Sequence, residues 1–148
     1  MGIVLRLRAA SLVALAGLFI ALYLLLYHLG FYGALVCGAG SCDVVQASEY
    51  ARFLGQPVPG WGVAWYAAVF ALSLIGLAGG SSEAGWPFRL LALAATGGLA
   101  FSVYLTWLEL FVIHAICFWC VASALLTLVI FLCVAPWRAV RARPPGAG

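Results

Sequence analysis

Charged residues are scarce in this sequence, and lysine is absent altogether. Only 7% of the 148 residues are charged, whereas a typical soluble domain has about 25%. Hydrophobic residues make up 67% of the chain, so we expect an integral membrane protein rather than a soluble one. All seven basic residues are arginines, and the net charge of +3 is too small and too scattered for a nucleic-acid surface.

The chain has no internal repeat, and its length suits a single domain. A transmembrane helix needs about 20 apolar residues, so four spans would use most of the chain. Apolar runs predict these spans at about residues 10–29, 61–78, 88–111 and 117–135. The first run follows two arginines, as in a signal peptide, but it is longer than a typical signal core. The predicted fold is therefore an all-α integral membrane bundle of four transmembrane helices.

The longest polar connection, residues 30–60, is the first outer loop in this scheme. Within it, residues 43–54 have the composition of a short amphipathic helix lying at the membrane surface. Pro57 and Pro59 end that segment before the second span begins. Residues 112–116, in contrast, leave room only for a tight hairpin between the third and fourth spans.

The arginines predict how the bundle is oriented. With four spans both termini lie on one side of the membrane, and that side then carries every arginine except Arg52. Because arginine-rich segments stay in the cytoplasm, we expect residues 1–9 and the tail, residues 136–148, to be cytoplasmic. The chain would be a multi-pass protein of the cell inner (cytoplasmic) membrane, with residues 30–60 and the start of the fourth span on its outer face.

Four of the five cysteines gather on that outer face. Cys37 and Cys42 lie in the outer loop, and Cys117 and Cys120 begin the fourth apolar run. The outer compartment is oxidising, which favours disulfide chemistry. Thiols in the first turn of a helix are also close to the positive end of its dipole, which favours the thiolate. Cys133 falls at the cytoplasmic end, where we interpret it as a packing thiol.

Two outward dithiols suggest an electron relay. Thiol–disulfide exchange proceeds by attack of a thiolate on a sulfur, through a mixed disulfide. A mobile loop pair can meet a protein partner in water, whereas a fixed pair at the membrane boundary can meet an acceptor in lipid. That acceptor must take two electrons and dissolve in the bilayer, so a quinone is the natural candidate.

The order of these motifs resembles a known family. The residues that carry the resemblance are Cys37-x4-Cys42-Asp43-Val44-Val45, Ser48-Glu49-Tyr50-Ala51, Gly55-Gln56-Pro57-Val58-Pro59, Gly62, the run from Tyr104 to Ile113, and Cys117-x2-Cys120. In this order, over about residues 12–134, they are similar to the bacterial homologues of vitamin K epoxide reductase.

That resemblance implies a four-helix bundle around a quinone of the menaquinone, ubiquinone or vitamin K type, capped by the outer loop. It further implies that Cys37 receives electrons from a partner protein, that Cys42 exchanges with Cys117, and that Cys120 meets the quinone. Many bacterial members carry a fused thioredoxin-like domain. This chain has no room for one, so the implied partner is a separate thioredoxin-fold (DsbA-like) protein outside the cytoplasmic membrane.

Quinone-contacting residues are harder to assign. The resemblance makes Ser48 a residue that supports the site, and aromatic candidates for lining the pocket are Trp65, Tyr66, Phe111, Phe118 and Trp119. Aromatic residues also gather at membrane boundaries, so interfacial anchoring explains the same residues. Animal members place a tyrosine four residues past the second cysteine of the CxxC motif, where this chain has Ala124.

Two ionisable residues precede the CxxC motif, and each has two interpretations. Glu109 would tune the electrostatics or the proton supply of the site, or it is an interfacial carboxylate. His114 would stabilise a thiolate or relay a proton, or it is a solvated loop histidine.

Three other functions stay open at this point. The same fold and cysteines would suit reduction of a quinone epoxide. Four outward thiolates would also suit a tetrahedral zinc site in a protein that is not an enzyme. DsbB-type quinone reductases likewise have four spans and two cysteine pairs. They carry the CxxC motif in the first outer loop, however, and here that order is reversed.

Membrane-impermeant thiol reagents test the predicted topology. Applied to reduced, intact cells, they should modify at least one thiol of each outer pair and leave Cys133 unmodified, because only the two pairs face the outer compartment. Mass spectrometry of the labelled protein reads the result, with permeabilised cells as the control. Reaction of the two pairs from opposite sides of the membrane would close the proposed electron route.

Overall fold

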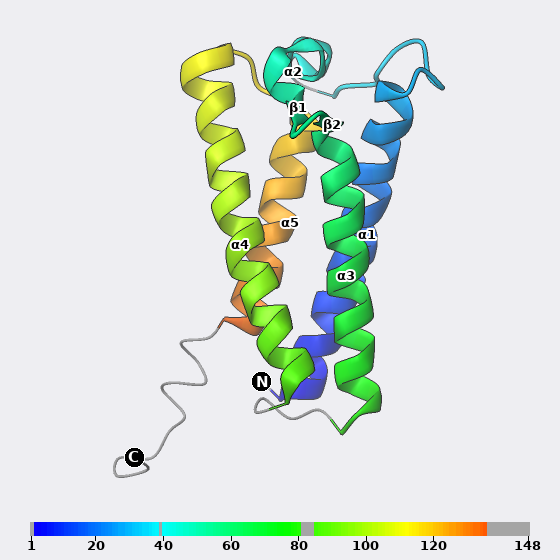
Figure 1. The fold of residues 1–148 in the computed structure, drawn as a ribbon, viewed down its shortest axis with the longest axis vertical. Coiled ribbons are helices and arrows are strands. Elements are labelled where there is room, and N and C mark those ends of the chain that lie inside the picture. Colours follow the sequence, from blue (N-terminus) through cyan, green and yellow to red (C-terminus); the bar gives the residue numbers. More distant parts are fainter. Residues whose placement is uncertain (1, 39, 81–84, 136–148) are drawn as a thin grey trace.

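The computed structural model describes residues 2–38, 40–80 and 85–135. Four long helices in this part of the chain run side by side, as Figure 1 shows: α1 (Ile3–His28), α3 (Val58–Ala78), α4 (Trp86–Leu108) and α5 (Phe118–Val134). Three of them, counting α4 with its continuation to Ile113, are long and apolar enough to cross a membrane, and α5 is a shorter apolar helix. Residues 81–84, between the second and third predicted spans, and the predicted tail lie outside the described residues.

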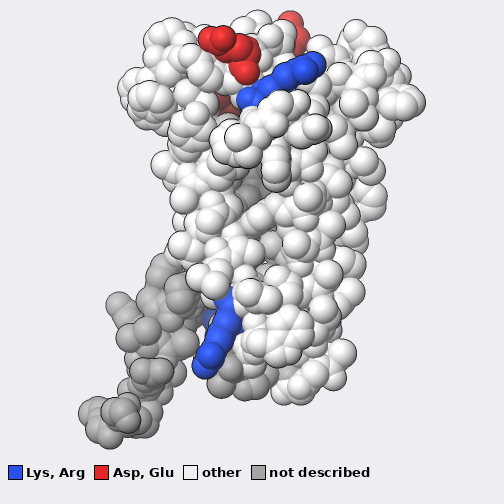
Figure 2. All heavy atoms as spheres, in the orientation of Figure 1, with Lys and Arg blue, Asp and Glu red and all other residues white. Residues whose placement is uncertain are grey.

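Charge is confined to the two ends of this bundle on the face drawn in Figure 2. Acidic and basic side chains lie at the loop end, basic side chains lie at the opposite end, and the belt between them carries none. A charged side chain within the apolar core of a bilayer costs several kcal/mol. The uncharged belt therefore matches a membrane protein, as the composition predicts.

Helix α1 begins at Ile3, earlier than the predicted start of the first span at residue 10. Arg6 therefore belongs to the helix, and its side chain is buried. Its Nε donates to the carbonyl of Cys133 (2.6 Å), and its guanidinium lies over the ring of Phe88. The last carbonyls of a helix have no partner within it, so Arg6 satisfies one at the end of α5 and joins three helices.

The outer loop contains less helix than predicted. Helix α2 (Cys42–Ala47) starts where expected, but it ends at Ala47, and Ser48 is extended. A single 3-10 turn, η1 (Glu49–Ala51), follows, and then a hairpin of β1 (Arg52–Phe53) and β2 (Gln56–Pro57). Positive φ angles at Leu54 (52°) and Gly55 (80°) form the hairpin turn. A helix cannot continue through such a turn, so the predicted helix over residues 43–54 is about half its expected length.

The connection between α4 and α5 is not a simple hairpin turn. Helix α4 passes into a π-helical segment, η2 (Glu109–Ile113), and His114 then adopts a left-handed conformation with φ of 56°. The N–H of Ala115 donates to the carbonyl of Glu109 (3.1 Å), which closes this segment. Such π-helical segments frequently occur at functional sites.

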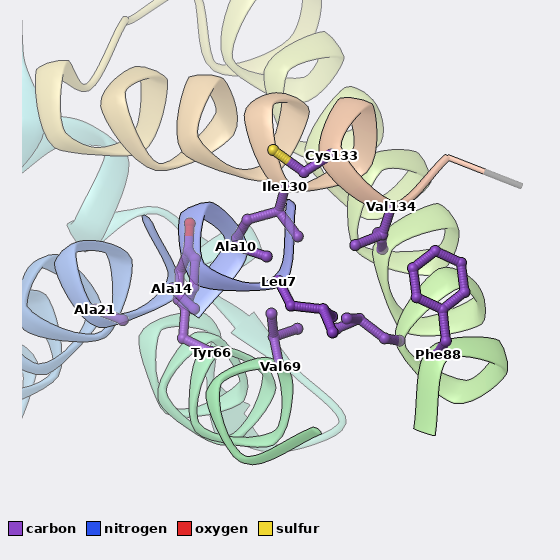
Figure 3. Close-up of a cluster of buried hydrophobic side chains, with 12 residues drawn as sticks. Leu7, Ala10, Ala14, Ala21, Tyr66, Val69, Phe88, Ile130, Cys133 and Val134 are labelled. Carbon is purple, nitrogen blue, oxygen red and sulfur yellow. The ribbon is translucent and has the colours of Figure 1, made fainter. Parts of the chain in front are cut away.

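Small residues on α1 let α3 approach closely. The buried face of α1 carries Ala10, Ala14, Gly17 and Ala21. Figure 3 shows Ala14 next to Tyr66, whose side chain extends from α3 toward α1. A Cβ added at Gly17 would overlap the ring of Tyr66. Close approach over small side chains is how helices gain packing contacts within a membrane.

This packing predicts unequal effects for two glycine substitutions. Gly17→Ala should destabilise the protein by about 1–3 kcal/mol, because Tyr66 is buried and must shift. Gly97→Ala, in α4, should be neutral or stabilising by about 0.5–1 kcal/mol, because its Cβ would meet no atom within 4 Å. Thermal unfolding in detergent measures both, and equal effects would contradict the proposed packing.

Candidate active site

The four cysteines of the two predicted pairs form one bonded and one unbonded pair. Cys37 and Cys42 are joined by a disulfide, with Cα atoms 6.0 Å apart. Cys117 and Cys120 are thiols. Cys42 and Cys117 are both fully buried and belong to one apolar cluster with Val45. The structure thus brings the two predicted pairs together, with Cys42 and Cys117 at their junction.

A backbone contact holds the loop against the segment that precedes α5. The N–H of Ser41 donates to the carbonyl of Ile116 (2.7 Å), and Gly40 pairs with Cys117 as an isolated antiparallel bridge. Gly40 has φ of 84°, and a Cβ there would overlap the carbonyl oxygen of Ile116. Only glycine combines this conformation with so close an approach. The bridge places the start of α2, and hence Cys42, beside Cys117.

Cys117 lies immediately before α5 and caps its first turn. Its sulfur accepts a hydrogen bond from the backbone N–H of Cys120 (3.3 Å), and its own N–H donates to Glu109 Oε2 (3.2 Å). The backbone N–H of Cys120 can thereby stabilise negative charge on the Cys117 sulfur when it leaves a disulfide as a thiolate.

Cys120 also lines a cavity of about 400 Å³ between α3, α4 and α5. Gln46 of α2 reaches over it, with Nε2 3.5 Å from the Cys120 sulfur. Gln46 is buried, and its Oε1 accepts no hydrogen bond from the described residues. Glu109 also lines the cavity, where its carboxyl group is in hydrogen-bonding contact with the Cys120 thiol. The cavity is therefore largely apolar, and Gln46 and Glu109 are among the polar side chains that line it with Cys120.

The predicted lining residues divide into two sets. Trp65 and Tyr66 line the large cavity, and Ser48 lines a small pocket of about 40 Å³ that also reaches Cys120. Phe111, Phe118 and Trp119 lie outside these walls. Phe111 is 64% exposed beside Trp107, and Phe118 packs against Trp119.

Hydrogen bonds fix the aromatic wall of the cavity. Trp65 Nε1 donates to the carbonyl of Ala94 in α4 (2.9 Å). The hydroxyl of Tyr66 lies 2.8 Å from Ser123 Oγ and 2.9 Å from the Ser123 carbonyl oxygen in α5. Because each ring is bound to a different neighbouring helix, the wall keeps its shape without an occupant.

Helical spacing in the sequence identifies further residues near Cys120 that the prediction above did not include. Residues three, four and seven positions after Cys120 are Ser123, Ala124 and Thr127, and all three line the cavity with it. That spacing marks one face of a helix, and it places Phe118 and Trp119 on other faces. Gln46 follows Cys42 by four residues, so the same rule places it on the buried side of α2.

The structure also bears on the metal site that the sequence left open. A tetrahedral site would need four thiolates, but Cys37 and Cys42 are consumed in a disulfide. Within residues 2–38, 40–80 and 85–135, no group of three or more His, Cys, Asp or Glu side chains is placed to hold a metal ion.

Comparison with known protein families shows which family the chain belongs to. The sequence model of the vitamin K epoxide reductase family (VKOR) matches residues 8–135, which is most of the chain. The chain belongs to this family. The resemblance seen in the sequence is thereby confirmed at the level of the family. Among individually curated proteins, none matches the chain.

Membership of the VKOR family implies a membrane oxidoreductase that generates disulfides and is linked to quinones. The cavity that Cys120 lines suits a quinone. Its walls are largely apolar, it reaches the Cys120 sulfur, and the buried Gln46 Oε1 is left without a partner in the described residues.

Two substitutions at Glu109 test how much its hydrogen bond to Cys117 contributes to the stability of this VKOR member. Glu109→Ala removes the acceptor of the buried Cys117 N–H and should destabilise the protein by about 1–3 kcal/mol. Glu109→Gln keeps an acceptor oxygen in the same place and should cost less. Unfolding in detergent measures the loss of stability in both variants. Equal losses would show that Glu109 does not stabilise the fold through its hydrogen bond to the Cys117 N–H.

Proposed function

We propose that this VKOR-family protein oxidises a thioredoxin-fold partner and passes two electrons through its cysteine pairs to a quinone. The observation that carries the proposal is the burial of Cys42 and Cys117 in one cluster, with Cys120 lining an apolar cavity beyond them. The sulfurs thus lie in the order that the route requires, from the outer loop to the cavity.

The partner acts on the Cys37 side of the loop disulfide. Cys37 is only partly buried, whereas Cys42 is fully buried, so a partner thiolate attacks the Cys37 sulfur and the Cys42 sulfur leaves. The second partner thiol completes the exchange, which leaves the partner oxidised and the loop pair reduced.

The second exchange passes the electrons inward. The Cys42 thiolate attacks the Cys117 sulfur of a Cys117–Cys120 disulfide, and the Cys120 sulfur leaves as a thiolate. Cys37 then attacks Cys42 and releases Cys117, whose thiolate accepts the hydrogen bond from the Cys120 N–H. Gln46 Nε2 donates to the Cys120 sulfur, which stabilises negative charge on it.

The quinone supplies a two-electron acceptor that diffuses in the bilayer. In our proposal Trp65 and Tyr66 form the wall against which its ring lies, and Ser48 supports α2 by donating to the carbonyl of Val45 (2.7 Å). The amide of Gln46 lies at the mouth of the cavity beside Cys120, where it can bind a polar oxygen. Whether a quinone epoxide is also reduced depends on the same residues.

We further propose that α5 is a fourth span and that the loop end of the bundle faces outward from the cytoplasmic membrane. Arg6, Arg8 and Arg89 lie near the opposite end of their helices, and Arg52 lies in the outer loop. This distribution supports the orientation predicted by the positive-inside rule.

Two cysteine variants test the assignment. Cys120→Ala should abolish quinone reduction, because it removes the sulfur at the cavity. Cys37→Ala should mainly block oxidation of the protein partner, while a small dithiol that attacks the half-buried Cys120 sulfur of the CxxC disulfide still supports quinone reduction. Quinone absorbance and partner thiol content measure the two activities, with Cys133→Ala as the control. Full turnover by Cys120→Ala would show that the roles are wrongly assigned.

A further inference from the structure

The backbone of Val36, the residue before Cys37, is hydrogen-bonded through both its N–H and its carbonyl. The carbonyl accepts a hydrogen bond from Trp119 Nε1 (2.7 Å), and the Val36 N–H donates to the hydroxyl of Tyr23 (3.0 Å). The rings of Tyr23 and Trp119 meet edge to face with centroids 5.6 Å apart. We call Tyr23 and Trp119 the Val36 clamp. It holds the chain beside Cys37 between α1 and α5.

Burial does not hold this point of the loop. The side chain of Val36 is 74% exposed, and Gly38 follows soon after with nothing within 4 Å of where a Cβ would lie. Glycine leaves the backbone free to rotate. Cys37 itself packs against the cluster of Cys42, Val45 and Cys117, and the two hydrogen bonds of the clamp fix the backbone just before it.

The clamp and the backbone bridge hold opposite ends of the same segment. The bridge ties Ser41 to Ile116 at the Cys42 end, and the clamp ties Val36 to Trp119 at the Cys37 end. Residues 116 and 119 lie on either side of Cys117 in the chain. The loop disulfide is thus fixed at both ends to the segment that contains Cys117.

A disulfide offers two sulfurs to an attacking thiolate, and the outcome depends on which one it meets. Cys37 and Cys42 both contact the cluster that contains Cys117, so proximity alone leaves two reactions open. We propose that Tyr23 and Trp119 are positioning residues that direct Cys117 to the Cys42 sulfur rather than the Cys37 sulfur. This inference rests on the proposed electron route.

The route needs this selectivity in both directions. If Cys117 joined Cys37, the buried Cys42 would be the free loop thiol, and a protein partner could not reach it. With Cys117 joined to Cys42, the free thiol is Cys37, which lies nearer the surface. The clamp thereby keeps Cys37 available to the partner protein and Cys42 available to Cys117.

A trapped mixed disulfide tests the proposal in the full-length protein without a quinone. In Cys120→Ala, the Cys117 thiolate attacks one loop sulfur and forms a new S–S bond, the Cys37–Cys42 bond breaks, and the other loop sulfur leaves as a thiolate. An alkylating reagent then marks that leaving thiolate. Both loop cysteines lie in one peptide, so fragment-ion mass spectrometry locates the alkyl group on Cys37 or Cys42.

With the clamp intact, the alkyl group should be on Cys37. Trp119→Phe and Tyr23→Phe each keep a ring but remove one hydrogen bond, so each should raise the ratio of Cys37-linked to Cys42-linked product roughly 3-fold to 10-fold. The matched control is Tyr32→Phe, which removes a hydroxyl from the ring that packs against Tyr23 and leaves both clamp hydrogen bonds in place.

The outcomes distinguish failure of the clamp proposal from failure of the proposed electron route. If the clamp variants keep the wild-type ratio, or if Tyr32→Phe changes it equally, the clamp does not direct the exchange and the inference is overturned. If the protein with an intact clamp forms no Cys42–Cys117 link, the proposed electron route itself fails. Tyr23→Phe keeps the CxxC motif unchanged, so it remains informative should Trp119→Phe disturb folding.

Discussion

The contact on which the site depends is a single backbone bridge between two segments far apart in the sequence. Ser41 donates to Ile116, and this bond places the first residue of α2 beside the residue that caps α5. Disulfide exchange requires sulfurs that meet directly. Without this bridge the chain would hold two cysteine pairs with no defined path between them, whatever the quality of the helix bundle below.

The bundle supplies a second condition, which is a cavity that keeps its shape. Its walls come from α3, α4 and α5, and the rings of Trp65 and Tyr66 are each hydrogen-bonded to a different neighbouring helix. Most of the lining is apolar, and the few polar side chains include Gln46 and Glu109 near Cys120. An apolar space with a few convergent polar groups is the usual form of a small-molecule site, and here those groups surround a sulfur.

The sequence predicted the parts of this site that depend on composition and spacing, but not those that depend on tertiary contacts. Apolar runs predict the long helices and spacing predicts the two cysteine pairs, whereas the meeting of Cys42 with Cys117 was implied only by the family resemblance. The π-helical segment at Glu109 was not foreseeable, because a hydrogen bond from Ala115 closes it and a left-handed His114 ends it. The rotation of α5 was foreseeable in principle, since a helical repeat counted from Cys120 identifies its cavity-facing residues.

The length of α5 has a consequence for the lipid around it. The helix has 17 residues, so it rises about 25 Å, whereas the hydrocarbon core of a bilayer is about 30 Å thick. If α5 spans the bilayer as we propose, this hydrophobic mismatch would thin the surrounding leaflets or set the CxxC end of the helix below the headgroups. Either adjustment would bring acyl chains level with the CxxC sulfurs. In the proposed reaction, an oily carrier would therefore exchange electrons without its ring entering the headgroup layer.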